Sequence, residues 1–225
     1  MLVINNLSCF LDGRQIINSL NGTFERGVVN AVYGINGIGK TTLFNCVYGL
    51  VKYTGDVLLD GKSICKDDIS YMTSETYFYP NLLGNEYLSV FENNFNAELF
   101  DINKLAELLG VPISTNIDTF STGMKRKIAF LAVLKLNRTV FLFDEPFNGV
   151  DAGSIEIMYT IIKLLVGFSK IVIITSHIQN HLTGIADVYL IMGKEHNRQI
   201  LKTGLMEYLQ EYNTDIYERI QETLL

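Results

Sequence analysis

The sequence predicts an α/β fold: a mostly parallel sheet with helices on both faces, an N-terminal antiparallel β subdomain and a helical insertion subdomain. Three observations lead to this prediction. The apolar runs at 139–143 and 170–175 are continuous, which is typical of strands buried on both faces of a parallel sheet. Residues 2–30 instead alternate apolar and polar positions, as half-buried antiparallel strands do. Within 74–138, apolar residues recur at helical spacing.

The composition is that of a folded protein with a sizeable core. Hydrophobic residues make up 48% of the 225 residues and charged residues 19%, with 13 Phe and 12 Tyr but no Trp. Such a chain can bury enough apolar surface to fold, so disorder is not expected. The net charge of -6 creates no broad basic field, and we therefore expect no nucleic-acid partner.

The sequence also indicates a compartment. The three cysteines are sparse and show no metal-ligand spacing with the three histidines, which suggests buried thiols in a reducing environment. Residues 1–6 lack the basic region and long apolar stretch of a secretory signal. The longest apolar run, at 161–174, is interrupted by polar residues and is too short to span a bilayer. We therefore expect a cytosolic protein.

In chain order, the first part of the sequence predicts antiparallel strands, then a strand, a loop and a helix. Turn signals divide residues 2–30 at Asp12-Gly13, Asn21-Gly22 and Arg26-Gly27. After the loop a helix reaches about Val47 and is ended by Gly49. The other strands expected here lie at 28–33, 55–61 and 69–72.

The middle of the chain predicts three helices, and the last part returns to strands. Helical spacing of apolar residues covers 86–95, 103–109 and 121–136, with Pro112 ending the second of these helices. Beyond them, helices are expected at 154–166 and 205–225, and strands at 139–143, 170–175, 186–192 and 198–203. The last two strands flank a polar hairpin connection at 193–197.

The loop between the strand at 28–33 and the first helix reads Gly-Ile-Asn-Gly-Ile-Gly-Lys-Thr-Thr, from Gly34 to Thr42. This spacing, between a strand and a helix, is that of a phosphate-binding loop. Its backbone N–H groups and the helix N-terminus would cradle phosphate oxygens, Lys40 would reach the β- and γ-phosphates, and Thr41 would ligate Mg²⁺. The alternative is a glycine-rich turn that binds nothing; the four fixed positions coincide by chance in about one chain in a hundred of this size. The loop predicts a P-loop NTPase core.

Two carboxylates, Asp144 and Glu145, directly follow the buried strand at 139–143. They would lie at the carboxyl edge of the sheet, where α/β proteins bind their ligands. Asp144 could hold Mg²⁺ through water, and Glu145 could accept a proton from the water that attacks the γ-phosphate. An Asp-Glu pair after a strand can also be a solvated turn, but the phosphate loop upstream favours the nucleotide interpretation.

With these motifs the chain resembles the ATP-binding subunit of ATP-binding cassette (ABC) transporters, of exporter type, over almost its whole length. The family signature, Leu-Ser-Gly-Gly-Gln, corresponds here to the sequence from Phe120 to Met124, with Ser121 and Gly123 at the start of a helix. A Ser hydroxyl and a Gly N–H at a helix start make a second phosphate clamp. The short loop after the carboxylates matches 148–151, and the switch histidine matches His177.

The resemblance implies one ABC ATPase domain over 1–225, with a RecA-like core at 1–73 and 139–225 and a helical subdomain at 74–138. It also implies a mechanism in which two such domains, as a homodimer or heterodimer, stack head to tail. Lys40 of one domain and Ser121 of the other then close on the same ATP. Water activated by Glu145 hydrolyses ATP, and the motion drives a separate transmembrane permease, which would hold this chain at the cytoplasmic face of the membrane.

The chain departs from the family pattern at three places. Ser74 stands where the family usually has a glutamine that touches Mg²⁺ and relays movement to the permease. Thr122 and Met124 replace the first Gly and the Gln of the signature. The family spacing for the aromatic residue that stacks on adenine falls on Leu11, and Phe10 is the nearest ring; core packing is the alternative role for Phe10.

The residues expected to carry the chemistry fall into three groups. The catalytic residues are Glu145 and His177. The metal ligands are Thr41, Asp144 through water, and Ser74. The ATP-binding residues are Gly34, Ile35, Asn36, Gly37, Ile38, Gly39, Lys40, Thr41, Thr42, Phe10, Ser121 and Gly123 in trans, and Asp151 at the dimer loop.

The expected function is an ATPase subunit of a membrane transporter, with ATP and Mg²⁺ as cofactors. Export is favoured because 80–88 and 121–125 are similar to exporter ATPases that act on drugs, peptides or polysaccharides. One alternative is an ABC-type ATPase without a membrane partner, as in iron–sulfur cluster assembly. Another is a nucleotide-dependent regulator with low turnover, which Glu145 and His177 argue against and Ser74 mildly favours.

Overall fold

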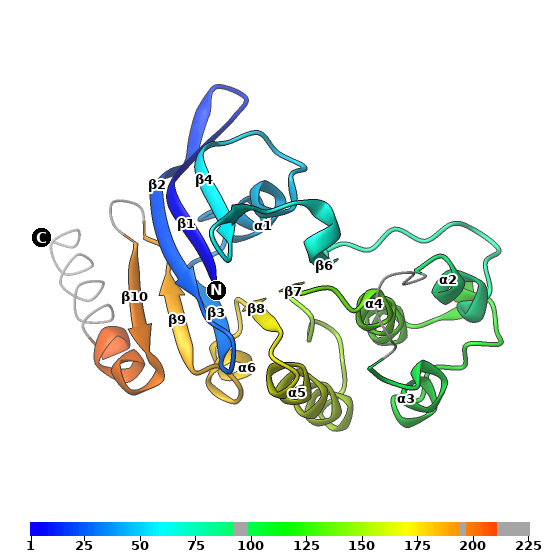
Figure 1. Ribbon diagram of the computed structural model, residues 1–225. Helices are drawn as coiled ribbons and strands as arrows, with labels where there is room; N and C mark the ends of the chain where they lie inside the picture. The colour runs from blue at the N-terminus through cyan, green and yellow to red at the C-terminus, as the bar shows by residue number, and fades with distance from the viewer. Residues whose placement is uncertain (92–98, 194–196, 211–225) are drawn as a thin grey trace, which may run out of the picture.

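A six-stranded sheet runs through the middle of the molecule in the computed structural model, which describes residues 1–91, 99–193 and 197–210 (Figure 1). The strand order is β10-β9-β3-β8-β7-β6, and every pair is parallel except β9 with β10. The strands are β3 (Val29–Tyr33), β6 (Ile69–Met72), β7 (Val140–Asp144), β8 (Ile171–Thr175), β9 (Val188–Ile191) and β10 (Arg198–Leu201). All residues of β7 and β8 are buried, which confirms the prediction from the two continuous apolar runs.

A second, four-stranded sheet is antiparallel and has the order β2-β1-β4-β5. Its strands are β1 (Leu2–Leu11), β2 (Arg14–Phe24), β4 (Thr54–Leu59) and β5 (Lys62–Ser63). The alternating pattern of residues 2–30 therefore predicted the antiparallel strands correctly. Asp12 and Gly13 form the turn between β1 and β2, and both have positive φ angles.

The turn predicted at Asn21-Gly22 is wrong, because both residues lie inside β2. Gly22 pairs with Ile4 across the antiparallel sheet. A Cβ atom at Gly22 would lie 3.2 Å from Cδ2 of Leu190, which belongs to β9 of the other sheet. The glycine thus allows a close approach of the two sheets, and a sequence pattern cannot distinguish that need from a turn.

Helices cover the two faces of the six-stranded sheet. Helix α1 (Lys40–Tyr48) lies on the same side as the antiparallel sheet, whereas α4 (Thr122–Leu136), α5 (Ala152–Gly167) and α6 (Gln179–Thr183) lie on the other (Figure 1). Each face has its own hydrophobic cluster: Val140 and Leu142 of β7 point into the first, Phe141 and Phe143 into the second. This alternation is the side-chain period of a strand that is covered on both sides.

Two short helices, α2 (Gly84–Ser89) and α3 (Ile102–Leu108), lie beside α4 at one end of the molecule (Figure 1). Two 3₁₀ turns, at Lys66–Asp68 and Ile117–Thr119, precede β6 and α4, and residues 202–210 are helical. Within the described ranges, none of the helices combines the length and apolarity that a bilayer span requires.

Several helix ends differ from the predictions. The helix expected at 86–95 ends at Ser89, and 92–98 lie outside the described residues. The helix before Pro112 ends at Leu108, because Gly110 turns the chain with a φ of 64° before the proline is reached. Of the helix expected at 205–225, the part beyond 210 lies outside the described residues. Gly49, with a φ of 79°, ends α1 as predicted.

Candidate functional site

The glycine-rich loop connects the carboxyl end of β3 to the first residue of α1, Lys40. Gly37 and Gly39 have φ angles of 79° and 110°, which side chains rarely adopt. A Cβ atom on Gly34 would lie 2.9 Å from the Met192 carbonyl oxygen and from a methyl group of Ile38. The loop can therefore adopt this conformation only with glycine at these positions. It ends at the N-terminus of α1, where unpaired backbone N–H groups can bind an anion.

The side chain of Lys40 folds back across this loop. Its Nζ donates hydrogen bonds to the carbonyl oxygens of Gly34, at 2.8 Å, and Ile35, at 3.2 Å. Burial lowers the pKa of Lys40, and the nearby charges of Glu145 and Asp144 act in the opposite direction. A buried cation with two carbonyl partners can exchange those partners for the oxygens of a phosphate.

Asp144 is buried at the end of β7 between two hydroxyl groups. Thr41 of α1 donates to its Oδ2 at 2.7 Å, and Thr175 of β8 donates to its Oδ1. The sequence therefore placed Thr41 and Asp144 correctly near each other, although 103 positions separate them. It did not identify Thr175, which looked like the last residue of an apolar strand.

The oxygens of Thr41 and Asp144 fit Mg²⁺ in their chemistry, because this cation prefers hydroxyl, carboxylate and water oxygens. In the described part of the chain, no three His, Cys, Asp or Glu side chains gather into a metal site. A cation held here would thus have few protein ligands and would take the others from phosphate oxygens and water. This is the arrangement typical of a metal that arrives with a nucleotide.

Glu145 has an unusual backbone conformation and a fixed side chain. Its φ angle of 52° lies in the left-handed region, which costs a residue with a side chain roughly 1–2 kcal/mol. Its N–H donates to the Thr175 hydroxyl at 3.1 Å, and its Oε2 lies 2.9 Å from Nδ1 of His177. The two residues predicted to be catalytic are therefore in contact.

Ser121, Gly123 and Asp151 form a second group, built on α4 and α5. Ser121 is the N-cap of α4, and its Oγ accepts a hydrogen bond from the Met124 N–H at 3.2 Å. A Cβ atom on Gly123 would lie only 2.6 Å from the Gly149 carbonyl oxygen, so the helix start approaches the 148–151 loop closely. Among the described residues, the hydrogen bonds of Ser121 and Asp151 do not reach the phosphate loop of the same chain.

Asp151 is the N-cap of α5, and its exposed carboxylate has several hydrogen-bond and charge partners. Its Oδ1 accepts from the Ser154 N–H at 2.9 Å and its Oδ2 from the Ser154 hydroxyl at 2.7 Å. Lys127 of α4 lies 3.4 Å from the same Oδ2. The hydrogen bond from the Ser154 hydroxyl, followed by that from its N–H and by Lys127, lowers the pKa of Asp151 to about 2.

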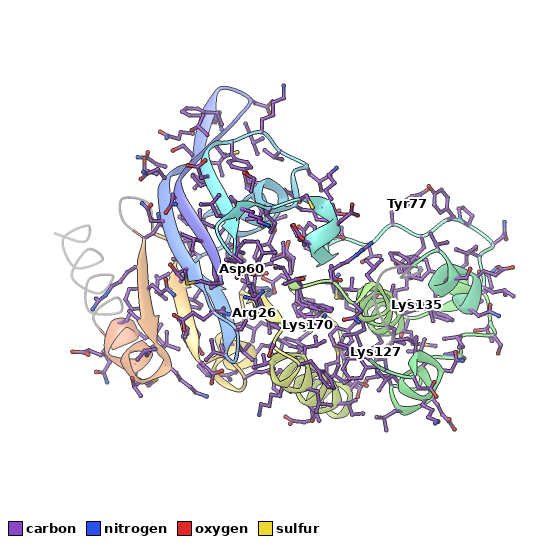
Figure 2. The ribbon with its side chains drawn as sticks, viewed as in Figure 1. Arg26, Asp60, Tyr77, Lys127, Lys135 and Lys170 are labelled. Atoms are coloured by element: carbon purple, nitrogen blue, oxygen red, sulfur yellow. The ribbon has the colours of Figure 1, made fainter. Side chains whose placement is uncertain are left out.

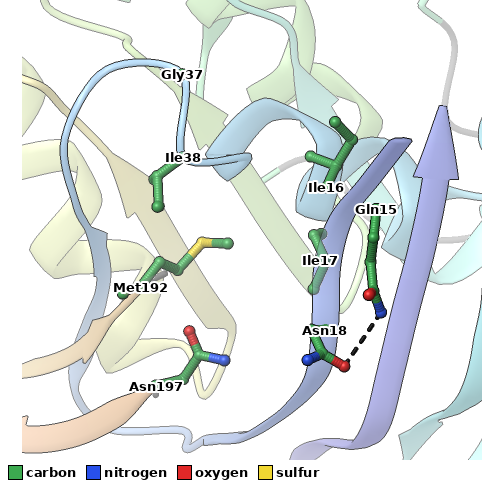
Figure 3. A pocket seen from close by; sticks show the side chains of 9 residues that line it. Gln15, Ile16, Ile17, Asn18, Gly37, Ile38, Met192 and Asn197 are labelled. Atoms are coloured by element: carbon green, nitrogen blue, oxygen red, sulfur yellow. Dashed lines mark hydrogen bonds between the residues drawn. The ribbon is translucent and has the colours of Figure 1, made fainter. Parts of the chain in front are cut away.

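A cavity of about 310 Å³ lies beside the phosphate loop (Figure 3). It is lined by Gln15, Ile16, Ile17, Asn18, Gly37, Ile38, Met192, Gly193 and Asn197. The lining combines aliphatic side chains with amides, and Gln15 donates to Asn18 at 3.1 Å. Phe10 lies on β1 outside this cavity lining, with 59% of its surface exposed, so the core-packing alternative for it is wrong, and its stacking on adenine stays a prediction.

Ser74 lies two residues beyond β6, at the same edge of the sheet as Asp144. The two strands are neighbours in register, since Met72 of β6 is opposite Phe143 of β7. Ser74 is half-buried. Its neighbour Thr73 is held by a residue that the sequence did not identify: Nη1 of Arg126 donates to the Thr73 carbonyl oxygen at 2.8 Å. In the sequence Arg126 is the middle one of three consecutive cations near the start of α4, and nothing local distinguishes it from Lys125 and Lys127.

Comparisons with known proteins agree with this geometry. The family described as "ABC transporter" matches residues 17–148, more than half of the chain. An uncharacterized ABC transporter ATP-binding protein of Bacillus subtilis, YhcH, is 31% identical over 86% of this chain and 67% of its own. A lantibiotic transport ATP-binding protein of Streptococcus pyogenes, SrtF, is 30% identical over 83% of this chain and 84% of its own.

A third relative, the cytochrome c biogenesis ATP-binding export protein CcmA of Saccharophagus degradans, is 29% identical over 77% of this chain and 86% of its own. Among solved structures, a bacterial ABC transporter cassette determined as a dimer superimposes with a TM-score of 0.77. That match covers 90% of this chain and 99% of the other, with 17% sequence identity, and it therefore shows the shared fold.

Proposed function

The chain belongs to the ABC transporter family of ATPases, and from this premise we propose that it binds and hydrolyses ATP to drive export through a separate membrane subunit. ATP hydrolysis is the typical activity of these domains. One observation carries the proposal for this chain: Lys40, Thr41, Asp144, Glu145 and His177 come from three segments and meet at one edge of the sheet. A binding protein without turnover has no need of the contact between Glu145 and His177.

We propose a role for each of these residues. The N–H groups of the glycine loop and Lys40 bind the phosphates of ATP, and the cavity beside the loop accepts its nucleoside. Thr41 and Asp144 would hold Mg²⁺, and the cation would neutralise charge on the phosphate oxygens. Glu145 accepts the proton of the attacking water, and His177 orients the Glu145 carboxylate through its contact with Oε2.

A head-to-tail dimer completes the site. Ser121 and Gly123 make their contacts with α4 and with the 148–151 loop, so they are available to the phosphates of ATP bound by another chain. Asp151 lies at the end of that loop and would contribute to the same interface. The relative solved as a dimer supports this assembly.

A membrane permease is the second partner that we propose, at the cytoplasmic face of the membrane. Two aromatic residues just beyond Ser74, Tyr77 and Tyr79, are 74% and 70% exposed, and their ring centroids lie 5.4 Å apart. Figure 2 shows Tyr77 on the connection that runs from β6 to α2. Exposed paired aromatics are typical of protein interfaces. Export is the favoured direction because CcmA is named as an export protein.

The test of this function is the Glu145→Gln variant. The amide keeps the shape of the side chain but accepts no proton, so phosphate release should fall about 100-fold or more, while ATP still binds. ATP that is bound and not hydrolysed should hold two chains together, and the variant should elute as a dimer from a sizing column with ATP and Mg²⁺.

The matched control is Glu156→Gln, an exposed Glu on α5, which should behave as the wild type does. A Glu145→Gln protein that binds ATP but remains monomeric would contradict the dimeric site. Phosphate release at the wild-type rate would contradict the role of Glu145.

A further inference from the structure

A buried guanidinium lies directly behind the proposed catalytic residues. Arg126 is part of α4, and it is one of the few charged side chains that the structure buries. Burial is the main influence on its pKa and lowers it, while the charges of Asp144 and Glu145 act to raise it. A charged side chain is removed from water only where hydrogen bonds compensate the loss of solvation.

The partners of Arg126 are main-chain carbonyl oxygens at the ends of two neighbouring strands. Its Nη1 donates to Thr73, which follows β6, at 2.8 Å. At the end of β7, its Nη2 donates to Asp144 and, at 2.6 Å, to Glu145, and its Nε lies 3.2 Å from the same Glu145 oxygen. The planar fork of arginine thus joins two strand ends that have no further ladder bonds with each other.

The contact with Glu145 has a particular consequence, because the backbone of this residue is in the left-handed region. Such a conformation persists only where the surroundings hold it. Thr175 holds the N–H of Glu145 and Arg126 holds its carbonyl oxygen, so the peptide groups on both sides are fixed. The direction of the Glu145 carboxylate follows from these two anchors.

The other branch of the fork reaches the segment that leads to Ser74. Arg126 belongs to the helix whose first residues include Gly123 and whose N-cap is Ser121. The next residue, Lys127 (labelled in Figure 2), donates hydrogen bonds to Asp151 and Ser154 at the start of α5. Helix α4 is therefore tied by adjacent side chains to the strand ends on one side and to α5 on the other.

We propose that Arg126 is a positioning residue, which couples the place of α4 to the direction of the Glu145 carboxylate and to the segment at Thr73 and Ser74. A shift of α4 relative to the sheet moves the guanidinium, and the backbone of Glu145 moves with it. The Glu145 carboxylate is then aligned to accept a proton only when α4, whose N-cap is Ser121, is packed in its position against the sheet. This inference rests on the proposed function, since it assumes that Glu145 is the proton acceptor.

The first test uses Arg126→Lys, which keeps the charge and most of the packing but loses the fork. A single ammonium cannot serve carbonyl oxygens on both strands, so kcat for phosphate release should fall on the order of tenfold to a hundredfold. KM for ATP should stay within about threefold of the wild type, because the phosphate loop is untouched. In the Glu145→Gln background, Arg126→Lys should cause no further loss of kcat.

The controls separate positioning from a general structural role. Lys163→Gln removes an exposed cation of α5 and should leave both constants unchanged. Arg126→Gln, which can make one of the hydrogen bonds at most, should lose at least as much kcat as Arg126→Lys. Unchanged kcat in both Arg126 variants, or an equal loss of ATP affinity in Arg126→Lys, would overturn the proposal.

A second measurement does not depend on turnover. Amide hydrogen exchange of the nucleotide-free Arg126→Lys protein should be about tenfold faster at 73–76 and 144–148 than in the wild type, with β1 and β2 unchanged. Unaltered exchange at both segments would refute the positioning role. If the wild-type protein itself releases no phosphate, the proposed function fails, and this exchange comparison alone decides the role of Arg126.

Discussion

At the scale of single residues, the site depends on charges and hydroxyls that are paired before any ligand binds. Asp144 accepts from two hydroxyls, Lys40 donates to two carbonyls, and Glu145 contacts His177. Each polar group therefore has a place and a partner that it can exchange for phosphate, metal or water. Such preorganisation reduces the rearrangement that catalysis requires.

Asp151 gives the residue scale a pH-dependent prediction. Its pKa is about 2 in the folded protein, below the ordinary 3.8, so its charge stabilises the fold above about pH 4 and this contribution is lost as the pH falls toward 2. Asn also caps a helix but carries no charge, so Asp151→Asn should remove this part of the pH dependence. Urea unfolding from pH 5 to pH 2 should show a shallower stability loss for Asp151→Asn than for the wild type. Parallel curves for the two proteins would contradict the prediction.

At this scale, motifs in the sequence identified most residues of the candidate site, but not the residues that hold them in position. Lys40, Thr41, Asp144 and Glu145 were found because they follow motifs with fixed local spacing. Thr175 and Arg126 have no such spacing, since their roles come from long-range contacts with Asp144 and Glu145. For Phe10 the structure excludes the core-packing role, because the side chain is exposed on β1, and stacking on adenine stays a prediction.

At the scale of elements, buried strands were predictable and helix ends were less so. Strands β7 and β8 are covered on both faces, and their continuous apolar runs predict this burial without any knowledge of the partner strands. The end of α3 depends instead on which of two breakers, Gly110 or Pro112, acts first. Gly22 could not be interpreted from its neighbours in the sequence, because a side chain there would crowd Leu190 of the other sheet.

The start of α4 carries a prediction of its own. Gly123 and Gly153 are both the second residue of a helix, but a Cβ atom on Gly123 would lie 2.6 Å from the Gly149 carbonyl oxygen, whereas one on Gly153 would meet only the Asp151 Oδ1 at 3.5 Å. Gly123→Ala should therefore destabilise the fold by about 1–3 kcal/mol through overpacking against backbone. Gly153→Ala should be neutral or stabilise by up to about 1 kcal/mol. Urea unfolding of both variants measures the difference; equal stabilities would show that the 148–151 loop moves freely away from α4.

At the scale of the whole molecule, both sheets and α1 contribute residues to the proposed ATP site, so ATP should stabilise the fold. At 100 times its dissociation constant a ligand contributes about 2.7 kcal/mol, which raises Tm by roughly 5–10 °C in a domain of this size. Chelation of Mg²⁺ should reduce this shift, because Thr41 and Asp144 then face phosphate without a cation between them.

Lys40→Ala tests whether that stabilisation comes through the phosphate loop. The variant should lose most of the ATP-induced shift in thermal unfolding, whereas Lys163→Ala, on the exposed side of α5, should retain it. A Lys40→Ala protein with the full shift would mean that ATP binds elsewhere.

The strand order also determines when the site can form during synthesis. Strand β3, which leads into the phosphate loop, has β8 and β9 as its neighbours, and both come from beyond residue 170. As the chain leaves the ribosome, an apolar strand ending at Tyr33 therefore waits without its partners until most of the protein has been translated. Pairings over such sequence distances form slowly and expose apolar surface meanwhile. The same topology that gathers the reactive side chains at one edge thus delays the burial of β3 in the nascent chain.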